Sequence, residues 1–131
     1  MGTISDATEH SARRPVVLIV EDEVLLRMHA TAVIEAAGFD TIEASDADDA
    51  IAILEARKDI RIVFTDIEMP GSMDGLKLSR AIRDRWPPIE LILTSGKRHP
   101  QADDLPERGK FFPKPYNPDA LVAAIRNFAN S

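Results

Sequence analysis

The sequence predicts an α/β fold: a doubly wound, five-stranded parallel sheet with helices on both faces. Two observations support this prediction. Five short segments are predicted to be strands, and the first is a continuous, largely β-branched apolar run that is typical of a strand buried on both faces. Segments with the three- and four-residue apolar spacing of helices alternate with these predicted strands, and such alternation is typical of a parallel sheet.

The predicted strands follow one another at regular intervals. They are residues 16–20, 39–44, 62–65, 89–93 and 111–112. Ser45 is expected to cap the helix that follows the second strand, and Asn117, followed by Pro118, the last helix. Pro100 and Pro106 bracket the segment before the last strand, so the fourth helix is expected to be short or irregular.

Composition limits the class of protein. The chain has 131 residues and 44% apolar content, which suits one domain: a flexible tail over residues 1–15 and a folded domain over residues 16–131. Its 16 Lys and Arg residues against 22 Asp and Glu residues give a net charge of −6. This balance argues against direct nucleic-acid binding and against a polybasic membrane anchor. With no Cys and no apolar stretch of membrane-spanning length, a cytoplasmic protein without thiolate chemistry is expected.

Polar residues follow four of the predicted strands at the point where each ends. They are Glu21 and Asp22, Asp66, Thr94, and Lys114. In an open parallel sheet these strand ends meet at one edge, where ligands bind. Clustered carboxylates repel one another unless a cation lies among them, and oxygen ligands indicate a hard ion, Mg²⁺ first. The set fits phosphoryl transfer to a carboxylate, with Asp66 as the nucleophile.

These residues resemble those of the CheY-like response-regulator receiver domains. The segments that carry the resemblance are Ile19–Glu23, Thr65–Pro70, Met73–Leu76, Leu93–Gly96 and Lys114–Tyr116. They occur in the family's order and cover residues 16–129. The resemblance implies the flavodoxin-like fold, with strand order 2-1-3-4-5, and a single-domain response regulator of two-component signal transduction.

The resemblance also implies the phosphorylation chemistry. Asp66 would accept a phosphoryl group from a sensor histidine kinase or a histidine phosphotransfer protein. Asp22, Asp66 and the backbone carbonyl of Glu68 would hold Mg²⁺, or Mn²⁺, and Glu21 would act through water. The domain is expected to catalyse only its own phosphorylation and dephosphorylation, and to turn over no separate substrate.

Switching is implied by the same resemblance. Thr94 and Lys114 would bind phosphoryl oxygens, and Phe111 stands where the family often has a switch tyrosine. The Lys114–Pro115 bond is expected to be cis. Because no further domain follows Ser131, we expect output through contact with an unidentified protein, and the sequence leaves open whether two copies form a homodimer.

Three alternatives remain at the level of sequence. The first is a phosphatase with an aspartyl nucleophile, in which Glu68 takes the place of the usual second Asp. The second is a flavodoxin-like cofactor binder. The sequence argues against it, because no Gly-rich phosphate-binding loop follows the first predicted strand. The third is a receiver-shaped docking module that is never phosphorylated.

Overall fold

The computed structural model describes residues 15–130, so all but the last residue of the predicted tail over residues 1–15 lies outside the described residues. The strands are Val16–Val20 (β1), Asp40–Ala44 (β2), Ile60–Asp66 (β3), Glu90–Ser95 (β4) and Gly109–Pro113 (β5). The helices are Val24–Ala36 (α2), Ala47–Ala56 (α3), Gly75–Arg85 (α4) and Pro118–Ala129 (α5). All strand pairs are parallel, and their order is β2-β1-β3-β4-β5, as predicted.

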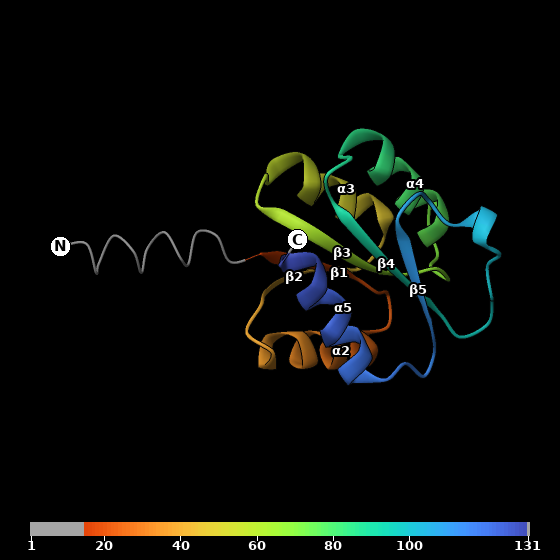
Figure 1. Cartoon of the computed structure of the whole chain (residues 1–131). Coiled ribbons are helices and arrows are strands. Elements are labelled where there is room, and N and C mark those ends of the chain that lie inside the picture. Colours follow the sequence, from red (N-terminus) through yellow and green to blue (C-terminus); the bar gives the residue numbers. More distant parts are fainter. Residues whose placement is uncertain (1–14, 131) are drawn as a thin grey trace.

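Helices cover both faces of the sheet. Helices α2 and α5 lie on one face, and α3 and α4 on the other (Figure 1). The sheet therefore separates two apolar layers, and the inner strands are buried on both sides. Every residue of β1 is buried, which explains why this strand is a continuous apolar run in the sequence and not an alternating one.

Helix α3 begins one residue later than predicted. Its N-cap is Asp46 and not Ser45, so the prediction of Ser45 was wrong. The carboxylate of Asp46 accepts a hydrogen bond from the backbone N–H of Asp49 at 2.8 Å, and the Asp49 carboxylate accepts one from the N–H of Ser45 at 3.2 Å. Aspartate caps as well as serine does, and Asp48, the carboxylate three residues after Ser45, instead accepts a hydrogen bond from the Ser72 hydroxyl at 2.7 Å. The predicted Asn117 cap is confirmed.

The segment between β4 and β5 forms no α-helix. It contains a single 3₁₀ turn, Ala102–Asp104, which confirms the expectation of an irregular fourth helix. Two guanidinium groups of α4 bind backbone carbonyls of this segment: Arg80 donates to Asp104 at 2.7 Å and Arg83 to Glu107 at 2.8 Å. These bonds satisfy carbonyls that a regular helix would pair internally. Within residues 15–130, no helix is long and apolar enough to cross a membrane.

Gly75 lets α4 start directly against the end of β3. Its backbone N–H donates to the carbonyl of Ile67 at 2.9 Å. A Cβ at this position would lie 1.9 Å from the carbonyl oxygen of Asp66, and this contact is with backbone that no side-chain rotation can relieve. The glycine therefore fixes the distance between the helix and the strand that carries Asp66.

We expect Gly75→Ala to destabilise the protein by about 1–3 kcal/mol, because the added methyl group must displace the backbone of residue 66 or 67. Urea denaturation measures this change. Gly96→Ala is the matched control, since its Cβ would meet only the Lys114 side chain at an ordinary distance of 3.7 Å. Equal stability losses in the two variants would contradict the assigned contact.

Candidate functional site

The strand register brings the ends of four strands to one level. Val20 pairs with Thr65 across β1 and β3, and Asp66 pairs with Thr94 across β3 and β4. Ser95 in turn pairs with Pro113 of β5. The residues that follow these positions must therefore share one edge of the sheet.

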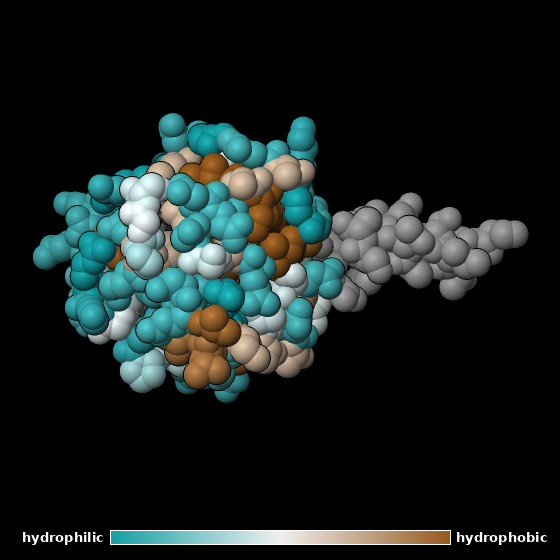
Figure 2. All heavy atoms as spheres, turned by 180° about the vertical axis from the view of Figure 1, so that it is seen from behind, coloured by the Kyte–Doolittle hydropathy of each residue, from teal (hydrophilic) through white to brown (hydrophobic). Residues whose placement is uncertain are grey.

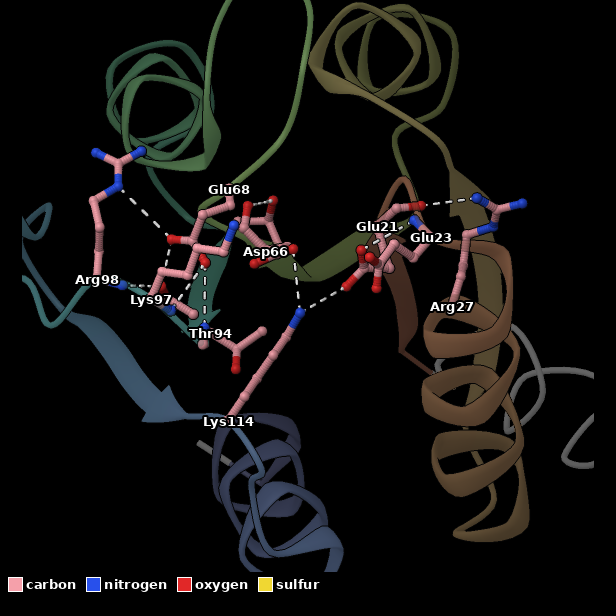
Figure 3. A network of polar contacts seen from close by, with 12 residues as sticks. Glu21, Glu23, Arg27, Asp66, Glu68, Thr94, Lys97, Arg98 and Lys114 are labelled. Carbon is pink, nitrogen blue, oxygen red and sulfur yellow. Dashed lines mark hydrogen bonds and ion pairs between the residues drawn. The ribbon is translucent and has the colours of Figure 1, made fainter.

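Lys114 lies between two acidic side chains. Its ammonium nitrogen is 3.2 Å from a carboxylate oxygen of Glu21 and 3.2 Å from Oδ2 of Asp66 (Figure 3). The carboxylates of Glu21, Asp22 and Asp66 each offer an oxygen, and these oxygens all lie within 4.8 Å of one another. Three formal negative charges thus face one positive charge.

Burial acts on the protonation of this cluster. Loss of hydration raises the pKa of Glu21 from its ordinary value of 4.5 to about 7, and the nearby charge of Asp66 adds to this effect. A hydrogen bond from the Glu23 N–H and the Lys114 ammonium oppose it. Burial likewise raises the pKa of Asp66 against the opposing charge of Lys114. For Lys114, burial alone would lower the pKa, but Asp66 and Glu21 raise it above its ordinary value.

One oxygen of this cluster lacks a partner. Oδ1 of Asp66 is buried and has no hydrogen-bond partner within the described part of the chain, although Oδ2 is bound by Lys114. A buried carboxylate oxygen without a partner is costly. The carboxylates of Glu21, Asp22 and Asp66 form an all-oxygen donor set of the kind that Mg²⁺ and Mn²⁺ prefer.

The sequence did not single out Arg27, which supports the acidic pair from α2. Its guanidinium donates to the backbone carbonyl of Glu21 at 2.8 Å and pairs with Glu43 of β2 at 2.9 Å. This contact fixes the turn between β1 and α2. Nothing in the local sequence indicates it, because Glu43 is 16 residues away.

The two predicted switch residues lie differently in the structure. Thr94 is buried beside Asp66, but its hydroxyl donates to the carbonyl of Phe112 at 2.7 Å and not to the carboxylate cluster. Phe111 packs against the apolar layer under α3 and α4, and its ring meets the edge of His99 at a centroid distance of 6.1 Å. Phe111 is therefore not part of the charged cluster.

The carboxylate of Glu68 points away from the cluster, toward the loop after β4 (Figure 3). It accepts hydrogen bonds from the Ser95 hydroxyl and from the backbone N–H of Gly96 at 3.2 Å. The Lys114–Pro115 peptide bond, directly after β5, is cis.

A half-open cavity of about 390 Å³ adjoins the charged cluster. Its apolar wall comes mainly from Leu26, Phe64 and Pro115, with His29 and Tyr116 also lining it. Asp66, Glu21 and Lys114 line one end of the cavity. His29 is an exposed residue of α2, and it lines this cavity together with Tyr116, which follows β5.

Comparison with known proteins agrees with this geometry. The response regulator receiver domain family matches residues 17–126. The chain belongs to this family. It is 36% identical over 121 residues to the aerobic respiration control protein ArcA of Escherichia coli (strain K12), covering 86% of this chain and 48% of ArcA. It therefore spans about half of that relative. The family assignment rules out the flavodoxin-like cofactor binder.

Two further relatives place the receiver domain in other contexts. The sensor kinase CckA of Brucella abortus (strain 2308) is 34% identical over 114 residues, which cover 84% of this chain and 12% of CckA. The crystal structure of a response regulator receiver protein from Pseudomonas putida superposes with a TM-score of 0.79 at 29% identity, covering 87% of this chain and 97% of that one. This receiver domain is thus a signalling switch of two-component systems and not a conventional enzyme.

The raised pKa of Glu21 predicts a pH-dependent stability. Because its folded-state pKa lies above the unfolded value, the folded protein binds more protons between about pH 4.5 and 7, and the free energy of unfolding falls as pH rises through this window. In metal-free buffer the loss is about 3 kcal/mol at most. Thermal denaturation at several pH values measures it.

Glu21→Gln is the control for this titration and should flatten the pH profile. Mg²⁺ should raise the melting temperature more at about pH 7.5 than at about pH 5, because the cation binds deprotonated carboxylates. An unchanged pH profile in Glu21→Gln would show that the titrating group lies elsewhere.

Proposed function

We propose that Asp66 is the phosphoacceptor of this receiver domain and that it takes its phosphoryl group from a phosphohistidine. The observation that carries the proposal is the buried Oδ1 of Asp66, which has no hydrogen-bond partner among residues 15–130 and belongs to the same cluster as the Lys114 ammonium and the Glu21–Asp22 pair. Asp66 lines one end of the cavity, and the Lys114 ammonium lies 3.2 Å from Oδ2 of the same carboxylate, where it can offset incoming negative charge.

The reaction exchanges one bond to phosphorus for another. An oxygen of Asp66 forms a P–O bond while the P–N bond of the phosphohistidine breaks, and the imidazole leaves with the electron pair and takes up a proton. Lys114, already 3.2 Å from Asp66, pairs with an oxygen of the transferred group. Thr94 donates its hydroxyl to another once it leaves the carbonyl of Phe112.

A divalent cation completes the proposed site. Asp22, Asp66 and the backbone carbonyl of Glu68 would hold Mg²⁺ or Mn²⁺, and Glu21 would contribute through water. When bound, the ion neutralises part of the negative charge on the phosphoryl oxygens. The chain's own contribution is to hold three carboxylates within reach of one ion despite their repulsion.

The structure disfavours turnover of a separate phosphate ester. A phosphatase of the alternative type needs a free carboxyl group two residues after its nucleophile. Here that group belongs to Glu68, which is occupied by Ser95 and Gly96. We propose that the domain catalyses only its own phosphorylation and dephosphorylation. The cytoplasmic location and output through contact with another protein stay predictions from the sequence, and whether two copies form a homodimer stays open.

An apolar patch on the first turns of α2 gives the phosphodonor a place to dock. Val24, Leu25 and Met28 are 55%, 80% and 57% exposed, and Leu26 beside them also lines the cavity next to Asp66. Figure 2 shows this patch as brown atoms low on the visible face. A protein that delivers a phosphoryl group to Asp66 must cover the cavity mouth, so we propose that the histidine kinase or phosphotransfer protein covers this patch.

Phosphorylation by a small phosphodonor tests the assignment of Asp66. Incubation with acetyl phosphate and Mg²⁺ should add one phosphoryl group, detected by intact-protein mass spectrometry. Asp66→Asn should abolish the addition and keep the far-UV spectrum of the folded protein. Chelation of Mg²⁺ should stop the reaction. Labelling that persists in Asp66→Asn would place the acceptor elsewhere, and a wild-type chain that stays unmodified would refute the proposal.

The docking patch is tested by comparing two kinds of donor. Leu25→Ser and Met28→Ser should slow transfer from a phosphorylated histidine phosphotransfer domain by about tenfold, because exposed anchors of this size contribute about 1–2 kcal/mol. Labelling by acetyl phosphate should stay unchanged, since neither side chain lines the cavity. Equal loss with both donors would indicate damage to the site and not to docking.

A further inference from the structure

The loop after β4 is fastened to the β3–α4 loop by one carboxylate. Glu68 accepts hydrogen bonds from the Ser95 hydroxyl and from the backbone N–H groups of Gly96 and Lys97, at 3.2 and 3.4 Å. Figure 3 shows Glu68 turned toward these donors, while Lys114 approaches Asp66 from the other side. We call Glu68 and its contacts with residues 95–98 the Glu68 latch.

Arg98 extends the latch to the start of α4. Its guanidinium lies 3.7 Å from Glu68 and 2.9 Å from Asp74. Its backbone N–H donates to the hydroxyl oxygen of Ser95 at 2.8 Å. Asp74 is itself the N-cap of α4, accepting from the N–H of Lys77 at 2.9 Å. The loop after β4, the β3–α4 loop and the first turn of α4 are thus connected through one set of charged contacts.

The Glu68 latch lies next to Thr94, whose hydroxyl has to turn toward Asp66 to bind a phosphoryl oxygen. Thr94 directly precedes Ser95, and in the latched arrangement its hydroxyl is bound to the carbonyl of Phe112. A phosphoryl group on Asp66 would be a second anion two residues from Glu68 in the chain. The donors that directly follow Thr94 are already taken by Glu68, so the two anions compete for one loop.

We propose that Glu68 is a positioning residue that holds the loop after Thr94 in the arrangement of the unphosphorylated chain, so that phosphorylation of Asp66 has to open the Glu68 latch. This inference rests on the proposed role of Asp66. Its consequence is quantitative: the apparent affinity for a phosphoryl group is reduced by the fraction of molecules whose latch is closed.

Ser95→Ala tests the proposal without altering any charge. It removes the hydroxyl that bonds Glu68 and keeps every backbone N–H of the loop. We expect it to tighten binding of beryllofluoride, a phosphoryl mimic, in the presence of Mg²⁺ by roughly tenfold, which is the lower end of the effect of losing one hydrogen bond to a charged group. NMR titration of the full chain measures the affinity. A merely structural role of Ser95 would lower stability without tightening binding.

Arg98→Ala and Lys97→Ala form a matched pair. Each removes one positive charge from the same loop, but only the Arg98 side chain belongs to the latch; that of Lys97 makes no hydrogen bond or ion pair among residues 15–130. Loss of a cation alone should weaken the binding of an anion. Arg98→Ala should nevertheless bind beryllofluoride more tightly than the wild type, and Lys97→Ala should not.

Hydrogen exchange separates the two proposals. Without Mg²⁺ or beryllofluoride, the amides of Gly96 and Lys97 should exchange several-fold faster in Ser95→Ala than in the wild type. Unchanged exchange, or unchanged or weaker beryllofluoride binding by Ser95→Ala, would overturn the latch. A wild-type chain that binds no beryllofluoride would contradict the proposed role of Asp66, and the exchange rates would then still decide whether the latch exists.

Discussion

The ion pairs of Lys114 with Glu21 and Asp66 allow three carboxylates to share one edge of the sheet. Lys114 stands 93 residues from Glu21 and 48 from Asp66, so only the register of the parallel strands brings its ammonium to 3.2 Å from both. Burial raises the pKa of both Glu21 and Asp66, and the charge of Asp66 raises the pKa of Glu21 further. The site therefore depends on β1, β3 and β5 ending at the same level.

Two carboxylates at the start of the β3–α4 connection, Asp66 and Glu68, bind partners on different sides of it. Asp66 faces Lys114 and the cavity, whereas Glu68 faces the loop after β4. Gly75 closes this loop against the backbone of Asp66, so the loop has little room to rearrange on its own. Phosphorylation of Asp66 and movement of the loop after Thr94 are consequently coupled through residues 66–68. No longer path through the core is needed.

The segment between β4 and β5 is held in place by side chains of α4 and not by helical hydrogen bonds of its own. Where a regular helix would satisfy its own carbonyls, Arg80 and Arg83 of α4 bind the carbonyls of Asp104 and Glu107. These guanidinium groups are already occupied, so they contribute less to the recognition of acidic partners than the number of basic residues suggests. Among residues 15–130, the large apolar side chains that are exposed lie instead on α2, and one of them, Leu26, lines the cavity next to Asp66.

The sequence by itself determined the alternation of strands and helices, the irregular segment between Pro100 and Pro106, and which polar residues leave the strand ends. These features follow from local periodicity and from the shared direction of parallel strands. Only the tertiary structure decided that Oδ1 of Asp66 lacks a hydrogen-bond partner in the described part of the chain, that the Thr94 hydroxyl faces Phe112, and that Glu68 binds the loop after β4. Side-chain directions of this kind depend on partners 18 to 28 residues away, which no local pattern encodes.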